Sequence, residues 1–229
     1  MSKKYLLGVD GGTEGIRAGI FDIAGIPLAY ASTTYPTQFP APSWAEQYPN
    51  DWWNALGKSV RIAIRDSGIS VNQIAAMAVD TTCCSVVALD GSGNPVRPAL
   101  IWMDVRSAEQ TEQMLATEDD ALRINSNGSG PVSAEWMIPK ALWIKQNEPE
   151  NFDRAVTICE YQDYINLHLT GRLGVSINNV SVRWHCDYTG DGVPKSLLEK
   201  LDLGEIAEKW PQDVFRLGEL VGGLTPRAA

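Results

Sequence analysis

Residues 6–22, "LLGVDGGTEGIRAGIFD", join two apolar segments through a short turn near the start of the chain. Asp10 stands at the end of the first apolar segment, and Gly11 and Gly12 follow it directly. Glycine tolerates positive φ and allows close approach to the backbone, and the N–H groups of such a turn can converge on phosphate oxygens. The stretch therefore fits either an ordinary β-hairpin or a phosphate-binding loop, and the turn alone does not decide between them.

The polar residues beside the turn have the chemistry that a phosphate site requires. The Thr13 hydroxyl adds a donor, and Arg17 lies far enough along the second segment to reach the same phosphates. Asp10 can hold Mg²⁺ through water, because Mg²⁺ keeps most of its hydration shell. Two other phosphate motifs are absent: Trp52 stands where a P-loop ending at residues 57–59 needs glycine, and no G-x-G-x-x-G occurs.

Composition narrows the class of protein. The 229 residues are 44% hydrophobic and 21% charged, which is typical of a globular protein. A formal net charge of −9 argues against nucleic acid or an anionic membrane as a partner. We expect a cytoplasmic protein, because the sequence shows no secretory leader pattern and no apolar run of membrane-spanning length.

The four cysteines form no C-x-x-C pair, so a zinc site is disfavoured, and adjacent Cys83 and Cys84 are expected to be buried free thiols.

The first part of the chain predicts a meander followed by a helix. Residues 4–10, 16–22 and 27–34 are short apolar or alternating segments separated by turn residues, which predicts three antiparallel strands. An amphipathic helix then begins at Asn50 or Asp51 and stops at Gly68. Its predicted buried stripe consists of Trp53, Leu56, Val60 and Ile64.

The remainder alternates between strand and helix patterns. The continuous apolar run at 74–80 predicts a strand buried on both faces, with Asp80 buried and hydrogen-bonded at its end. Further strands are expected at 86–90, 99–104 and near 156–158, and helices at 107–117, 140–146 and 161–169, the last stopped by Gly171. This order predicts one α/β domain over residues 1–229, with a mixed sheet covered by helices on both faces.

Four separated stretches resemble the FGGY family of carbohydrate kinases. They are "GVDGGTEGIRAGIFD" from residue 8, "VDTTCCSVVALDGSGNPVRPALIWMDVRSAEQ" from residue 79, "SAEWMIPKALWIKQN" from residue 133, and "YQDYINLHLTG" from residue 161. The resemblance covers residues 4 to about 184, and the third stretch is most similar to pentulose kinases of the ribulokinase type. It implies an actin-like, ribonuclease-H-like fold and ATP-dependent phosphorylation of a sugar, with ATP and Mg²⁺ as cofactors.

The resemblance also implies roles for individual residues. Asp10 matches the position of a carboxylate near the metal and the transferred phosphoryl group, and the implied phosphate contacts are Gly11, Gly12, Thr13 and Arg17. The implied sugar contacts are Thr82, Cys83, Trp102, Asp104 and Lys140. Glu14 departs from the hydroxyl side chain that glycerol kinases carry, which weakens the case for glycerol as substrate.

Each implied contact has a purely structural alternative. Trp102 and Trp136 can be core aromatics, and Asp104 can form a structural ion pair with Arg106. Cys83 can fill space in the interior, and Lys140 can be a solvated helix residue. Glu160 and Asp163 could reach a cleft, although a helix surface is the expected place for both.

The resemblance places the family's catalytic base and adenine-binding motifs after the segment "GGLTP" at 222–226. We therefore expect this chain to be the sugar-binding part of a longer kinase, inactive alone and partnered by a C-terminal domain of the same protein. A stand-alone sugar-binding or regulatory module is the alternative, and the gene beyond codon 229 distinguishes the two. A non-sugar member of the actin-like superfamily is disfavoured by "EWMIPK" and "IWMDVR". The sequence decides neither the sugar nor the oligomeric state, although a homodimer is compatible with it.

Overall fold

A computed structural model describes residues 4–124, 132–190 and 192–229, and it divides the chain into two compact units. Unit 1 consists of Met1–Thr37 and Tyr48–Thr82. Unit 2 consists of Gln38–Gln47 and Cys83–Ala229. The mixed α/β composition agrees with the sequence prediction, but the strands belong to separate sheets in the two units rather than to one.

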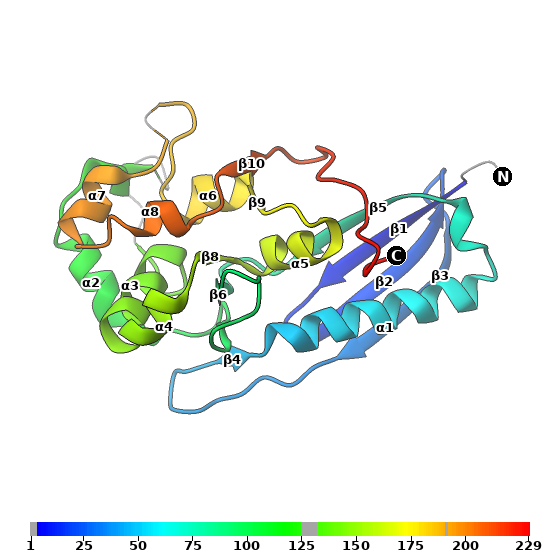
Figure 1. The fold of residues 1–229 in the computed structure, drawn as a ribbon, viewed down its shortest axis with the longest axis horizontal. Helices are drawn as coiled ribbons and strands as arrows, with labels where there is room; N and C mark the ends of the chain where they lie inside the picture. The colour runs from blue at the N-terminus through cyan, green and yellow to red at the C-terminus, as the bar shows by residue number, and fades with distance from the viewer. Residues whose placement is uncertain (1–3, 125–131, 191) are drawn as a thin grey trace. The chain divides into compact units, whose positions relative to one another are not determined.

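Unit 1 is built on a four-stranded sheet whose order is β3-β2-β1-β5. Its strands are β1 (Tyr5–Gly11), β2 (Gly15–Asp22), β3 (Pro27–Thr34) and β5 (Ile74–Thr81). The first three pair antiparallel, as the meander prediction required, and β5 pairs parallel with β1. Figure 1 shows these strands in blue and teal with helix α1 (Pro49–Ser67) lying along the sheet.

Helix α1 ends as predicted but begins and packs differently. Gly68 terminates it in the left-handed conformation, with φ of 68°, a conformation that glycine adopts without a Cβ penalty. The predicted cap at Asn50 or Asp51 is wrong, because the helix starts at Pro49. The buried residues are Pro49, Trp52, Ala55, Leu56, Ser59 and Ala63, so only Leu56 of the predicted stripe is buried.

Contact with the sheet explains why the buried face of α1 differs from the predicted stripe. The helix packs on β2 and β3. Ser59 faces the sheet and its hydroxyl donates to the carbonyl of Ile16 at 2.9 Å. Small side chains such as Ala55 and Ala63 permit close approach of a helix backbone to a sheet, which a hydrophobicity pattern alone does not reveal.

Strand β5 is less buried than its sequence predicted. It lies at the edge of the unit 1 sheet, where Ala75, Ala76, Ala78 and Asp80 are exposed. The prediction of a strand buried on both faces is therefore wrong for this unit. A continuous apolar run indicates a strand, but it does not say how many neighbours cover that strand.

Unit 2 contains an antiparallel sheet and a small parallel sheet. The antiparallel sheet has the order β4-β7-β6-β8, formed by β4 (Glu46–Gln47), β7 (Ala99–Leu100), β6 (Val86–Leu89) and β8 (Thr157–Glu160). β9 (Gly174–Ser176) pairs parallel with β10 (Asp213–Phe215). The strand predicted at 99–104 thus forms only at its first two residues, and Asp104 lies in the following loop.

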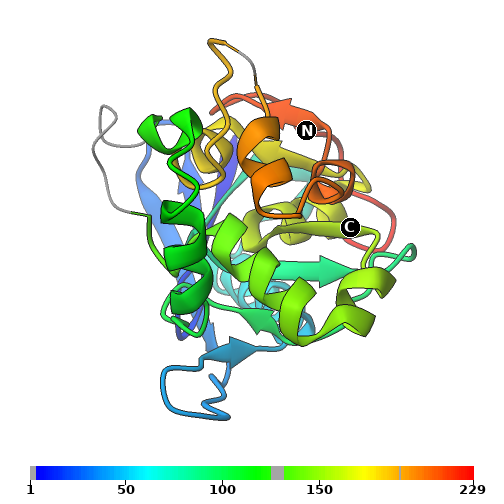
Figure 2. The same cartoon turned by 90° about the vertical axis from the view of Figure 1, so that its left-hand side faces the viewer.

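Seven α-helices of unit 2 fall within the described ranges (Figures 1 and 2). They are α2 (Ala108–Leu115), α3 (Met137–Asn147), α4 (Pro149–Arg154), α5 (Tyr161–Thr170), α6 (Ile177–Arg183), α7 (Lys195–Lys200) and α8 (Ile206–Lys209). The predictions for α2, α3 and α5 are confirmed, including the stop of α5 at Gly171 with φ of 71°. α3 is buried from Met137 to Ile144 on all sides, so it runs through the core of the unit. Within the described ranges, no helix has both the length and the apolar character that a membrane span requires.

The hairpin between β1 and β2 yields a stability prediction. A Cβ on Gly15 would lie 2.6 Å from the backbone oxygen of Thr33, so Gly15→Ala must displace β3 and is expected to cost about 1–3 kcal/mol of unfolding free energy. In the matched control Gly8→Ala, the new methyl meets the Phe21 ring at 3.4 Å, and the change should stay below about 1 kcal/mol. Urea unfolding of both variants measures the difference. Equal stabilities would contradict this account of the hairpin.

Candidate functional site

The Gly11–Gly12 turn of unit 1 is tightly closed. The N–H of Gly12 donates to the carbonyl of Gly15 at 3.0 Å, and the Tyr35 hydroxyl donates to the carbonyl of Gly12. A Cβ on Gly12 would lie 2.7 Å from the Arg17 guanidinium, so the arginine folds closely over the turn, although the end of this exposed side chain could shift to make room. The N–H of Thr82 donates to the carbonyl of Gly11 at 2.9 Å, which ties the end of β5 to the same turn.

Three charged side chains form a row across the sheet beside this turn. Asp10 is opposite Arg17 in the β1–β2 pairing and level with Asp80 in the β1–β5 pairing. Asp10 Oδ2 lies 3.0 Å from Arg17 Nη2, and the two side chains are 51% and 62% exposed. Asp80 is also exposed, so its prediction as a buried strand-end residue is wrong. A second carboxylate therefore lies on the neighbouring strand, which sequence reasoning missed because parallel register is not visible in the sequence.

This row fits a hydrated magnesium ion bound with a nucleotide. Mg²⁺ is commonly held by one or two carboxylates together with water and substrate phosphates, and Asp10 with Asp80 provides such carboxylates. Within the described ranges, no three His, Cys, Asp or Glu residues are grouped as an all-protein metal cage. Glu14 is exposed at the tip of the turn, and its backbone carbonyl accepts from the Tyr35 N–H.

Lys140, one of the predicted sugar contacts, is a buried lysine of unit 2. Lys140 is 0% exposed, and its Nζ donates to the carbonyls of Cys84 at 2.8 Å and Ile101 at 2.7 Å, with Leu100 at 3.4 Å. An ammonium group has three protons, so these three carbonyls match its donors. Burial lowers the pKa of Lys140 to about 8, although the negative charges of Asp104 and Glu160 oppose this shift.

This placement changes the interpretation of Lys140. The alternative of a solvated helix residue is wrong, because α3 runs through the core. Direct contact with a sugar has no exposed atom to support it. Lys140 instead connects the turn at Cys84 to the segment that precedes Trp102, two places where the sequence predicted sugar contacts.

A buried carboxylate supports the same turn. Glu160 Oε2 accepts from the N–H of Cys84 at 2.8 Å, and Oε1 accepts from the Trp184 indole at 2.7 Å. Burial raises the pKa of Glu160. Asp163 is buried as well and accepts from the Glu160 N–H at 2.9 Å. The expectation that both acids lie on a helix surface is therefore wrong: each is buried and accepts a hydrogen bond from a backbone N–H, and Glu160 also binds the Trp184 indole.

The loop after β7 is fixed by a second buried network. Asp104 pairs with Arg106 at 2.7 Å, and both side chains are fully enclosed, which matches the ion-pair alternative. The Arg106 guanidinium also contacts Glu46 at 2.8 Å and lies over the Trp44 ring, 3.8 Å from its centroid. Of the predicted sugar set, Trp102 is 37% exposed, whereas Thr82 and Cys83 are half-buried and Asp104 and Lys140 are enclosed.

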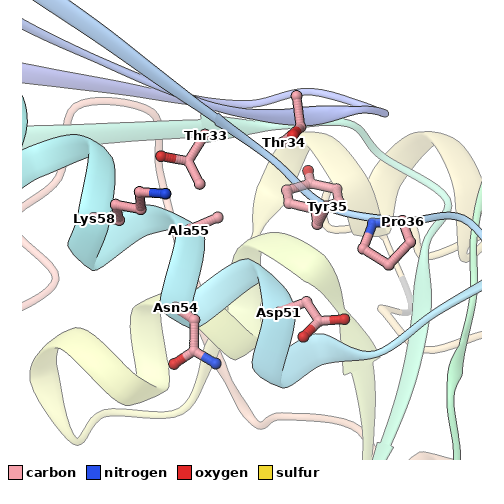
Figure 3. A pocket seen from close by; sticks show the side chains of 8 residues that line it. All are labelled: Thr33, Thr34, Tyr35, Pro36, Asp51, Asn54, Ala55 and Lys58. Atoms are coloured by element: carbon pink, nitrogen blue, oxygen red, sulfur yellow. The ribbon is translucent and has the colours of Figure 1, made fainter.

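A pocket of about 180 Å³ lies elsewhere in unit 1, between the end of β3 and the start of α1 (Figure 3). Its lining residues are Thr33, Thr34, Tyr35, Pro36, Asp51, Asn54, Ala55 and Lys58. None of the residues expected to bind phosphate or sugar lines it. We assign it no role.

Replacing Lys140 should destabilise the protein more than replacing a partly exposed lysine on the same helix. Lys140→Met leaves three buried carbonyls without their donor, and we expect a loss of about 3–5 kcal/mol in unfolding free energy. Lys145→Met on the same helix removes only partly exposed contacts with Asp202 and Glu205, and should cost less than about 1 kcal/mol. Denaturant unfolding of both variants checks this, and similar losses would contradict the buried role.

The lowered pKa of Lys140 also predicts how the unfolding free energy changes with pH. The pKa of Lys140 is lower in the folded protein, at about 8, than in the unfolded chain, at about 10.4, so the unfolded state binds more protons between these values. The unfolding free energy of the wild type relative to Lys140→Met should therefore rise from pH 8 to pH 10. A flat difference would show that the folded lysine keeps an ordinary pKa, and a falling one would show that its pKa is raised; either would contradict the expected shift.

Comparison with known proteins agrees with the fold and the motifs. The family model for the FGGY family of carbohydrate kinases, N-terminal domain, matches residues 5–229. The ribulokinase of Anoxybacillus flavithermus is 30% identical over 260 residues, covering 100% of this chain and 45% of that protein. The xylulose kinase of Lactococcus lactis is 31% identical over 172 residues, covering 74% of this chain and 33% of that protein.

A solved structure supports the fold. The crystal structure of xylulose kinase from Rhodospirillum rubrum matches with a TM-score of 0.88 at 24% identity, over 99% of this chain and 46% of that chain. This chain thus spans less than half the length of the relatives it matches. Since the family model covers nearly every residue, the chain belongs to the FGGY family of carbohydrate kinases and corresponds to the family's N-terminal domain.

Proposed function

We propose that this chain is the sugar-binding part of an ATP-dependent kinase that phosphorylates a hydroxyl of a ketopentose, such as ribulose or xylulose. The observation that carries the proposal is the exposed Asp10–Arg17 pair beside a glycine turn, in a chain that matches this family throughout. Relatives named ribulokinase and xylulose kinase at about 30% identity support a pentulose as substrate.

In unit 1, the turn would receive the nucleotide phosphates. Gly11 and Gly12 would let a phosphate approach the backbone closely, the Thr13 hydroxyl is a proposed donor, and Arg17 would turn from Asp10 to a phosphate oxygen. Asp10, with Asp80 beside it, would hold Mg²⁺ through its water ligands. When bound, the metal neutralises charge on the transferred phosphoryl group.

In unit 2, the proposed sugar contacts divide into two groups. Trp102 and Cys83 have exposed surface and would touch the sugar. Thr82, a further proposed sugar contact, is the last residue of unit 1. Asp104 and Lys140 are enclosed and would act as positioning residues, because they fix the loops from which Trp102 and Cys83 project. We propose that the catalytic base and the adenine site belong to a C-terminal domain of a longer polypeptide, so this chain alone would not transfer phosphate.

The test is an assay of the longer enzyme with ATP, Mg²⁺ and a panel of ketopentoses, ketohexoses and glycerol. We expect the highest kcat/KM for a ketopentose. Preference for glycerol or a ketohexose would contradict the substrate class, and phosphorylation of none of them would contradict the kinase proposal.

The same assay tests the role of Asp10. Asp10→Asn removes the carboxylate charge while keeping its shape, and kcat should fall by about 100-fold or more. Its stability should change little, because the ion pair with Arg17 is exposed. Asp66→Asn, which changes an exposed carboxylate on α1, is the control and should leave kcat unchanged. Near-normal turnover of Asp10→Asn would remove this residue from the mechanism.

A further inference from the structure

Glu160 joins the Cys84 turn to helix α6 through one buried carboxylate. The residue is 0% exposed. Its Oε2 accepts from the Cys84 N–H at 2.8 Å and from Asn179 Nδ2 at 3.2 Å, and its Oε1 accepts from the Trp184 indole at 2.7 Å. Asn179 lies in the first turn of α6 and Trp184 directly follows its last residue. Both ends of this short helix are therefore bound to the carboxylate that holds the turn.

These partners require an acceptor at both oxygens of Glu160. A backbone N–H and an indole N–H donate and cannot accept, and an ionised carboxylate accepts without donating. Glutamine has nearly the same shape, but one of its terminal atoms is an NH₂ group, which would face the Trp184 indole in one orientation and the Cys84 N–H in the other. Either way a donor meets a donor. The acid is needed here for its chemistry as well as for its size.

The conformation held in this way is one that Cys84 does not favour by itself. Its φ is 61°, in the left-handed region that residues other than glycine rarely adopt. Its N–H is bound to Glu160 and its carbonyl to Lys140, each at 2.8 Å, so an acidic and a basic side chain, both buried, hold the two sides of the residue. Without the acid, the turn should relax towards an ordinary conformation.

We propose that Glu160 is a positioning residue for sugar binding: its carboxylate fixes the Cys84 turn against α6 and so sets the place at which Cys83 meets the sugar. The inference rests on the proposed function, in which Cys83 is a sugar contact. Glu160 has no exposed surface, so it acts through the turn and not by touching the ligand. Its loss should weaken sugar binding in the ground state and the transition state alike, which raises KM and leaves kcat nearly unchanged.

The first experiment measures the sugar kinetics of Glu160→Gln in the longer enzyme at saturating ATP. We expect KM for the ketopentose to rise by about 10-fold while kcat changes by less than about 3-fold. Asp119→Asn is the matched control, because Asp119 is another buried carboxylate of unit 2 and is bound by Ser196 and Lys200. The control should lose stability and keep its KM. An unchanged KM in folded Glu160→Gln, or an equal rise in the control, would overturn the proposal.

A rescue experiment separates control of the turn from a general loss of packing. Glycine adopts the left-handed conformation without a Cβ penalty, and alanine does not. Adding Cys84→Gly to Glu160→Gln should recover about 3-fold of the lost sugar affinity, whereas adding Cys84→Ala, which removes the same thiol, should recover none. Equal effects of the two second substitutions would show that Glu160 does not act through the conformation of Cys84.

The connection to α6 is tested in this chain without any sugar. Trp184→Phe takes the indole N–H away from Glu160, but in Glu160→Gln it also leaves room for the NH₂ group to face no donor. Denaturant unfolding of the two single variants and the double variant should therefore show a double variant that is more stable than the summed losses predict. Additive losses would overturn the connection.

Asn179→Ala keeps the proposal open to test if Glu160→Gln fails to fold. It removes one contact between α6 and the carboxylate and leaves the Cys84 N–H bound, so KM for the ketopentose should rise by about 3-fold. An unchanged KM would overturn the proposal while leaving the kinase assignment intact. Phosphorylation of no ketopentose by the wild-type longer enzyme would instead contradict the proposed function and with it the sugar-positioning role, whereas non-additive unfolding would still support the link between α6 and the turn.

Discussion

The buried ammonium of Lys140 is the constraint on which the proposed sugar site of unit 2 depends. Three backbone carbonyls from two separate segments meet at one nitrogen, and no uncharged side chain of similar length supplies three donors to them. Burying an unpaired ammonium is costly, so the lysine and the carbonyls hold each other in place. The Cys84 turn and the Ile101 segment are thereby fixed relative to one another.

Other enclosed charges extend this support. Glu160 holds the N–H side of the same Cys84 turn, and Asp104 holds the loop after Trp102 through the Ala45 N–H and Arg106. The half-buried Cys83 and the exposed Trp102 consequently project from rigid backbone. A site built in this way can present a few exposed groups accurately, because their supporting residues have little freedom to move.

The predictable parts of this molecule are those set by local chemistry. Gly68 and Gly171 end their helices because a left-handed residue is needed there, and the three-strand meander follows from alternation and turn residues. Burial was less predictable, because it depends on partners distant in the sequence. The charged residues Lys140, Glu160 and Asp163 lie inside, whereas the apolar strand β5 is partly exposed and brings Asp80 level with Asp10. Family resemblance singled out Cys83, Trp102, Asp104 and Lys140 together, but it did not distinguish the residues with exposed surface from the enclosed ones that hold the loops.

The most direct test of this account is a crystal structure of the protein grown with a ketopentose. The account predicts that the sugar contacts Cys83 and Trp102, while Lys140 stays enclosed with its ammonium on the carbonyls of Cys84 and Ile101. A sugar bound away from both residues, or a Lys140 side chain that leaves those carbonyls to bind the sugar itself, would contradict it.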